Sequence, residues 1–288
     1  MTNTTNAAPL PAMPSDPHER TPAGKPRFAG LGHRRRWPLA RHSLVLAGCS
    51  LTKTGRNPGL LLDALILPVM FLVLFVYLFG GAVAGSTREY LQYVLPGILV
   101  LTTILVGQTA TGMNLVIDMK KGIFDQFRAL PIGRSAPLIG SVLGDGVRYL
   151  VAVLILFGLA FLLGFRVQTG VLSTLAGVGV AMIFGFALSW LAVAVAVLLR
   201  EETVVATVGF LLPFPLVFGT DMAAPMETMP AWLQTWAGIN PVSHAIEASR
   251  ALLLGGPAAE PVLMTLLWAG IFLVVLFPLA LVAYRRRA

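Results

Sequence analysis

The chain has 288 residues, of which 56% are hydrophobic and 12% charged, and its mean hydropathy is +0.80. Soluble domains carry about 25% charged residues, and 21 basic with 13 acidic side chains are too few to cover a soluble fold of this length. Composition therefore excludes soluble enzymes and cytosolic binding modules and indicates a membrane protein. The net charge of +8 leaves two explanations open, nucleic-acid binding and membrane topology.

The first 59 residues are rich in proline and basic residues. Residues 1–35 hold six prolines between Pro9 and Pro26 and no apolar periodicity, so we expect a disordered cytoplasmic tail. Residues 36–59 place Trp37, Leu44 and Leu51 among basic side chains, which predicts a basic amphipathic interface helix. A basic tether without a partner is the alternative.

Six segments are long and apolar enough to cross a bilayer. A spanning helix needs about 20 apolar residues, because a hydrocarbon core of about 30 Å is crossed at 1.5 Å per residue. Runs of this length without alternation indicate helices. The sequence therefore predicts an all-α polytopic membrane protein whose domain at 60–284 has spans at 60–79, 93–116, 142–165, 171–199, 203–220 and 263–284.

The basic residues orient these spans. With the amino terminus inside, 18 of the 21 lysines and arginines lie on the inner side, including the basic end at 285–288, and only Arg88, Arg166 and Arg250 lie outside. Basic residues favour the cytoplasmic side of a membrane. We therefore expect both termini in the cytoplasm, a location in the plasma (inner) membrane, contact with anionic membrane lipids, and no nucleic-acid partner.

The inner loop between the second and third spans contains a short amphipathic stretch. Ile123 and Phe127 follow helical spacing with Phe124 beside them, and Arg128 belongs to the surrounding charged face. Such a helix either lies on lipid or docks into a soluble partner.

The outer loop between the fifth and sixth spans contains two short helical patterns. Trp232 and Trp236 form an aromatic stripe suited to the outer membrane interface. A second helix is expected to begin at Asn240-Pro241 and to end at Leu254, before Gly255-Gly256-Pro257.

Two features of this region allow alternative interpretations. Glu247 and Arg250 are three residues apart, so they form a local ion pair or take part in substrate release. Pro213 and Pro215 remove two backbone donors inside the fifth span, which predicts either a hinge beside the pore or a helix satisfied by its neighbours.

Sequence patterns for soluble catalysis are missing. The chain has no G-x-x-x-x-G-K-[ST] loop, no H-E-x-x-H and no G-x-S-x-G, so we expect no catalytic, metal or cofactor site in it. A proton-coupled carrier would need carboxylates in the middle of its spans, whereas Asp63 and Asp145, like Arg148, lie near span ends, so proton-coupled transport is disfavoured. They are the only candidates for a membrane-embedded lipid-modifying enzyme, and a passive channel is the third possibility.

The order of these parts resembles the permease subunits of type-2 ABC exporters. The resemblance covers roughly residues 40–288 and rests on LPGIL at 95–99, FRALP at 127–131 and NPVSHAIEASRALL at 240–253, which are similar to daunorubicin/doxorubicin-resistance permeases. It implies a permease that pairs with a second permease copy or a paralogue and with a cytoplasmic ATP-binding subunit, which would hold ATP and magnesium.

The resemblance also implies roles for the two loops. The coupling helix that seats in the ATPase would be formed by Ile123, Phe124, Phe127 and Arg128, and the helices within 230–254 would lie at the outer mouth. The expected function is export of an amphiphilic drug-like or lipid-like molecule, with a glycolipid or polysaccharide as the alternative. Phe71, Phe75, Phe184 and Phe210 are apolar side chains that fit either lipid contact or a substrate cavity.

Overall fold

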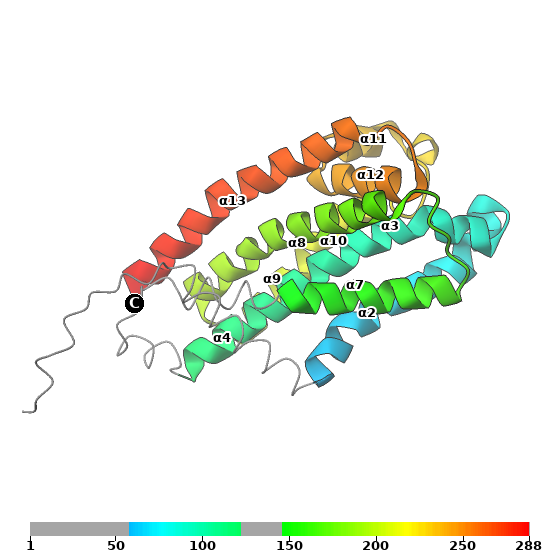
Figure 1. Ribbon diagram of the computed structural model, residues 1–288. Coiled ribbons are helices and arrows are strands. Elements are labelled where there is room, and N and C mark those ends of the chain that lie inside the picture. The colour runs from blue at the N-terminus through cyan, green and yellow to red at the C-terminus, as the bar shows by residue number, and fades with distance from the viewer. Residues whose placement is uncertain (1–57, 122–145, 288) are drawn as a thin grey trace, which may run out of the picture. The chain divides into compact units, whose positions relative to one another are not determined.

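The computed structural model describes residues 58–121 and 146–287, and every regular element in these two ranges is helical (Figure 1). The predicted tail at 1–35 and residues 36–57 of the predicted interface helix lie outside the described residues, whereas residues 285–287 of the predicted basic end form the last part of α13. The elements are α2 (Pro58–Ala84), α3 (Thr87–Leu105), the π-helix η1 (Val106–Thr111), α4 (Gly112–Lys120), α7 (Gly146–Leu162), α8 (Val171–Leu199), α9 (Glu202–Leu211), α10 (Pro213–Phe218), the 3-10 helix η2 (Met226–Thr228), α11 (Ala231–Ile239), α12 (Pro241–Leu254) and α13 (Ala259–Arg287).

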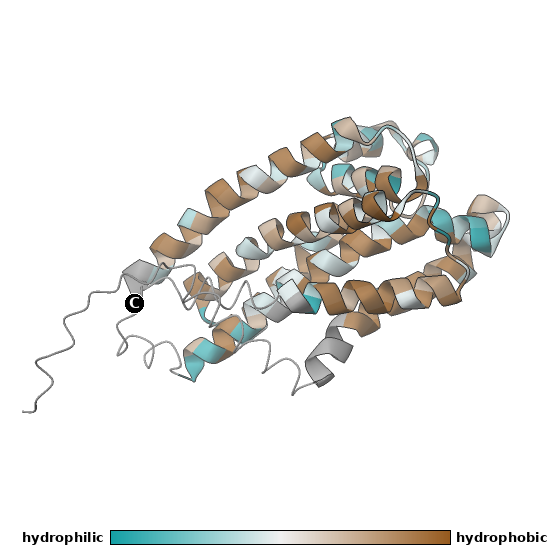
Figure 2. Ribbon diagram, in the orientation of Figure 1, coloured by the Kyte–Doolittle hydropathy of each residue, from teal (hydrophilic) through white to brown (hydrophobic). Residues whose placement is uncertain are grey.

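Each predicted span falls on one or more of these helices. Within the described residues, four helical stretches are long and apolar enough to cross a membrane, at Leu65–Ala84, Thr87–Lys120, Val171–Leu199 and Ala259–Tyr284. The third and fifth predicted spans fall on shorter apolar helices, Arg148–Leu162 and Glu202–Phe218. Apolar residues predominate along α7 and α13 (Figure 2). The all-helical class is confirmed, with four helices of spanning length.

Helix α8 is the element around which the others pack. It contacts α13, α12 and α3, and it lies between α13 and α3 in Figure 1. Gly185 of α8 lets α3 approach closely, because a Cβ atom at this position would lie 2.7 Å from the Cβ of Thr103. Small residues serve the same purpose in other membrane helices, where van der Waals packing drives association.

Replacing Gly185 with alanine should destabilise this contact. The added methyl group would also lie 2.9 Å from the backbone carbonyl carbon of Thr103, and such overpacking costs about 1–3 kcal/mol. Gly179→Ala is the matched control, because it lies on the same helix and its Cβ would meet no atom within 4 Å. Thermal unfolding in detergent should show a lower Tm for Gly185→Ala only; equal Tm values would contradict the close contact.

The buried apolar residues form two large clusters that follow one another along the helices. The outer core contains most of α3, the first part of α8 up to Leu188, and α12. The inner core contains Leu115 and Val116 of α4, α8 from Trp190 onward, Val205 of α9, and the last part of α13. We name these two clusters the outer core and the inner core after the sides on which the predicted orientation would place them; they divide α8 between residues 188 and 190.

Two helices change their backbone pattern between these cores. The second predicted span is helical throughout, but the six residues Val106–Thr111 form a π-helix between α3 and α4. The fifth predicted span is divided at Leu212 into α9 and α10, and Pro213 occupies the first position of α10. This change of helix falls at the two prolines, because proline cannot donate the backbone hydrogen bond of a continuous helix, and the hinge and the helix satisfied by its neighbours both stay predictions.

Candidate functional site

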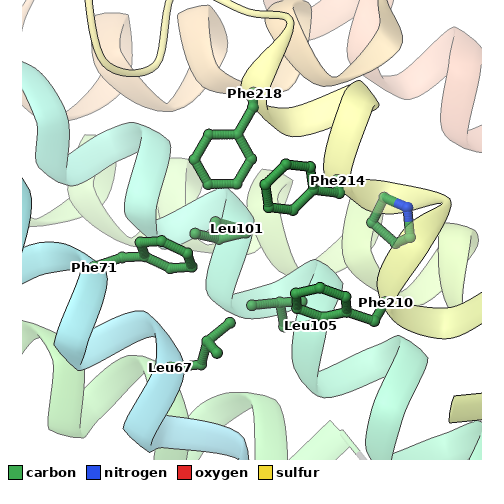
Figure 3. A pocket seen from close by; sticks show the side chains of 8 residues that line it. Leu67, Phe71, Leu101, Leu105, Phe210, Phe214 and Phe218 are labelled. Atoms are coloured by element: carbon green, nitrogen blue, oxygen red, sulfur yellow. The ribbon is translucent and has the colours of Figure 1, made fainter. Parts of the chain in front are cut away.

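An apolar hollow lies between α2, α3 and the divided helix α9–α10. It is lined by Leu67 and Phe71 of α2, Leu101 and Leu105 of α3, and Phe210, Pro213, Phe214 and Phe218 of the fifth predicted span (Figure 3). No lining side chain carries a charge or a hydrogen-bonding group. The lining is therefore wholly apolar and offers no polar anchor for a ligand.

Aromatic rings form one wall of this hollow. The rings of Phe214 and Phe218 stack with centroids 4.4 Å apart, and Phe71 meets Phe218 edge-on at 5.4 Å. Phe210 adds a tilted contact with Phe214 at 5.9 Å. These are the separations at which aromatic pairs attract, so the wall holds its own shape.

The four phenylalanines named from the sequence have different positions. Phe71 and Phe210 line the hollow, and Phe75 contacts Phe218 behind it at 6.3 Å. Phe184 is fully buried against Phe272 and is absent from the lining. Sequence reasoning named neither Phe214 nor Phe218 as a lining residue, although Phe214 stands between the two prolines that it singled out.

The two helical patterns between the fifth and sixth predicted spans are present as α11 and α12. Trp232 and Trp236 lie on α11, with exposed fractions of 71% and 45%. The side chain of Asn240 caps α12 by accepting a hydrogen bond from the backbone N–H of Val242 at 2.9 Å, and Pro241 follows as the first helical residue. Asn240 also donates to the carbonyl oxygen of Leu216 at 2.6 Å, which joins α12 to α10.

Arg250 does not form the local ion pair with Glu247 that its spacing suggested. Its guanidinium pairs with the carboxylate of Asp221 and donates a second hydrogen bond to the Asp221 carbonyl oxygen at 3.1 Å. Tyr93 of α3 donates to the same carbonyl oxygen at 2.7 Å, and its ring lies 4.3 Å from the guanidinium carbon. The three residues Tyr93, Asp221 and Arg250, the clamp, thus tie α3, the segment after α10 and α12 together. Sequence analysis did not name Tyr93 or Asp221.

Glu247 on α12 has a raised pKa. Burial of the carboxyl group is the main cause, and the charges of Asp221 and Glu260 act in the same direction, whereas His244 and Arg250 oppose it. Burial disfavours the charged form of a carboxyl group. The protonated form therefore stabilises the folded state relative to the ionised form.

The substitution Glu247→Gln should reveal this effect in the pH dependence of stability. The contribution of protonated Glu247 is present below the pKa of the unfolded chain and is lost as pH rises through the higher pKa of the folded state. Glu247→Gln should therefore raise Tm relative to the wild type at neutral pH, and the gap should close below about pH 4. A difference in Tm between the two proteins that grows as the pH falls would contradict a raised pKa of Glu247 in the folded state.

Of the three charged residues predicted near span ends, only Arg148 has a described side chain. Arg148 was expected at the membrane interface, but it is a fully buried side chain of α7, with an exposed fraction of 2%. Its expected neighbour Asp145 lies outside the described residues, as does the side chain of Asp63. α7 begins at Gly146, two residues before Arg148, so this buried side chain belongs to the first turn of the helix.

The predicted docking residues Ile123, Phe124, Phe127 and Arg128 lie outside the described residues. The helix that leads to them ends at Lys120, whose ammonium group pairs with the carboxylate of Glu202 at 3.1 Å. Glu202 is the first residue of α9, so the start of the loop is joined to the helix that lines the hollow.

The fold and the sequence together define a helical membrane protein, and comparison with known proteins gives its family. The profile of the ABC-2 type transporter family matches residues 44–254, and the chain belongs to this family. It is an integral membrane protein of the permease class, whose transporters also contain an ATP-binding subunit.

Similar curated proteins are permeases too. The chain is 40% identical over 80% of its length to a daunorubicin resistance ABC transporter permease protein of Streptomyces coeruleorubidus, of which it covers 81%. It is 30% identical over 82% of its length to a probable doxorubicin resistance ABC transporter permease protein of Mycobacterium tuberculosis, of which it covers 85%. A putative transport permease of Cyanophora paradoxa is 28% identical, with 68% of this chain and 69% of that protein aligned.

Proposed function

We propose that this chain is the membrane-spanning half of an exporter that carries an amphiphilic drug-like or lipid-like molecule from the cytoplasm or the inner leaflet to the outside, driven by ATP hydrolysis in a separate subunit. The chain crosses the plasma membrane six times with both termini in the cytoplasm, and it pairs with a second permease copy or a paralogue. The observation that carries the proposal is family membership together with similarity to two permeases named for daunorubicin and doxorubicin resistance.

The hollow supports the choice of an amphiphile. Its aromatic and aliphatic lining would contact the apolar part of the substrate. The lining has no polar side chain that could bind a sugar hydroxyl or a phosphate. A glycolipid or polysaccharide substrate is the second candidate, and its carbohydrate would have to be held elsewhere.

Residues 122–131 are assigned to the ATPase contact in this proposal, through Ile123, Phe124, Phe127 and Arg128. The ion pair between Lys120 and Glu202 joins the beginning of this loop to α9, which lines the hollow. It therefore supports transmission of a movement of the loop to the hollow. ATP closure in the partner would push the loop and rearrange the helices around the substrate. Co-purification of the chain with an ATP-binding subunit from the native membrane, and ATPase activity of that complex stimulated by daunorubicin, test the proposal; a chain that purifies without such a subunit would contradict it.

Truncation of the aromatic wall should weaken substrate binding. Phe218→Ala removes ring contacts with Phe214 and Phe71 and the matching surface for an aromatic ligand. A ring contact is worth about 0.5–1.5 kcal/mol, so the daunorubicin concentration that half-saturates transport should rise about 2- to 12-fold. Phe161→Ala on α7 is the control, because Phe161 is 52% exposed and outside the hollow. An equal effect of both substitutions would show that the substrate does not bind at the hollow.

A further inference from the structure

The two irregular points of the bundle lie beside each other. Gly209 of α9 packs against η1, because a Cβ atom on Gly209 would lie 3.4 Å from the backbone carbonyl oxygen of Gln108. Leu212, where α9 gives way to α10, follows one helical turn later. The π-helix of one helix and the proline break of the other are therefore neighbours, and we call this pair the paired break.

The paired break borders the hollow, and we call this border its inner end, after the predicted orientation of the chain. Leu105, the last residue before η1, and Pro213, the first residue of α10, both line it. Gln108 of η1 lies next to Leu188 of α8, because its side-chain amide donates a hydrogen bond to the Leu188 carbonyl oxygen at 3.0 Å. Leu188 is the last outer-core residue of α8, so the paired break coincides with the division between the two cores.

Beyond the break, α4 and α9 are joined along their lengths. A Cβ atom on Gly112 would lie 2.9 Å from Cγ1 of Val205 and 3.0 Å from the Cβ of Ala192, so α4 approaches both α9 and α8 closely. Val205 shares the inner core with Leu115 and Val116 of α4. The ion pair between Lys120 and Glu202 closes the contact at its far end. An exposed ion pair contributes little energy, so the apolar and glycine contacts hold the helices together.

We propose that α4 and α9 move as one unit during transport, turning at the paired break while the outer core stays fixed, and that this turn reshapes the inner end of the hollow. The proposal rests on the proposed function and adds how the loop after Lys120 would act on the substrate site. Gly112 and Gly209 are then positioning residues, because Gly112 lets α4 approach α9 and Gly209 lets α9 approach η1.

Helix chemistry makes the break a reasonable place to turn. A π-helical segment has a wider hydrogen-bond pattern than the α-helix, and such segments occur often at functional sites. Pro213 and Pro215 have no backbone N–H group, so the neighbouring helix lacks the hydrogen bonds that these two residues would otherwise donate. Hinges of this kind take up motion at a few residues between rigid bodies, and here the moving body is the pair of helices α4 and α9.

Two cysteine pairs test the proposal in the complex of this chain with its ATP-binding subunit. Both use a Cys49→Ser background, which removes the single native cysteine, and a short bismaleimide cross-linker. Lys120→Cys with Glu202→Cys joins α4 to α9 at side chains that are 46% and 45% exposed, so these changes should not disturb folding. Leu67→Cys with Phe210→Cys joins α2 to α9 across the hollow.

ATP-driven daunorubicin uptake into inside-out vesicles is measured before and after cross-linking. We expect uptake to survive the cross-link between residues 120 and 202 and to be lost with the cross-link between residues 67 and 210. Loss of uptake with the first pair, or its failure to cross-link, would overturn the single-unit motion. If the Cys49→Ser parent takes up no daunorubicin, the proposed function fails instead. Survival with both cross-links would show that the hollow need not change shape, which also overturns the inference.

Discussion

A double change of Phe127→Asp and Arg128→Glu should separate the permease from its ATP-binding subunit and abolish ATP-driven transport. Phe127 is proposed to fill an apolar seat in the partner, and aspartate would place an unpaired charge there. Loss of an aromatic anchor at an interface typically costs 2 kcal/mol or more, which corresponds to about 30-fold weaker binding, and the reversed charge adds to that. Pull-down of the ATP-binding subunit with tagged permease measures the effect directly.

Two controls separate docking from general damage. Phe127→Leu with Arg128→Lys keeps an apolar side chain and a positive charge, so it should retain most of the binding. Arg88→Glu reverses an exposed charge next to the start of α3, at the opposite end of that span from Lys120, and should leave binding unchanged. Binding and transport that both survive the double change at residues 127 and 128 would show that these residues do not form the docking helix.

The second large effect is expected from Arg250→Ala. This substitution leaves the carboxylate of Asp221 buried without its guanidinium partner, and breaking one side of a buried ion pair costs about 3–5 kcal/mol. It also removes the cation held against the ring of Tyr93. We expect a large fall in Tm in detergent and poor recovery of folded protein from the membrane.

A double-mutant cycle shows whether the pairing itself is responsible. Asp221→Ala with Arg250→Ala removes both charges, so the double variant should be more stable than the sum of the two single losses predicts. Glu247→Gln on the same helix is the matched control and should show no loss at neutral pH. Additive single and double effects would mean that Asp221 and Arg250 act independently.

Local chemistry in the sequence was enough to predict several elements. The bounds of α8 agree with the predicted fourth span at 171–199, because an unbroken apolar run has no competing start or stop signal. The cap by Asn240, the proline at 241 and the following glycines likewise located α12. The division of the fifth span was also predictable, since proline acts on its own helix.

Features that depend on contacts between distant residues were not predictable. The partner of Arg250 is Asp221, 29 residues away, whereas the spacing suggested Glu247 on the next helical turn. The polar run that starts at Gln108 inside an apolar span could have suggested an irregular segment, but the hydrogen bond from Gln108 of the π-helix to Leu188 of α8 joins residues 80 positions apart. The lining of the hollow comes from three separate segments of the chain, so no single pattern could identify Phe214 and Phe218.

Transport by the purified chain in proteoliposomes, with and without its ATP-binding subunit, tests the central claim most directly. Daunorubicin movement across the membrane is followed by its fluorescence, with ATP supplied on the side of the ATP-binding subunit. The account predicts accumulation only when both subunits and ATP are present, and none with the permease alone. Daunorubicin flux through liposomes that contain only this chain would contradict it and would indicate a passive channel.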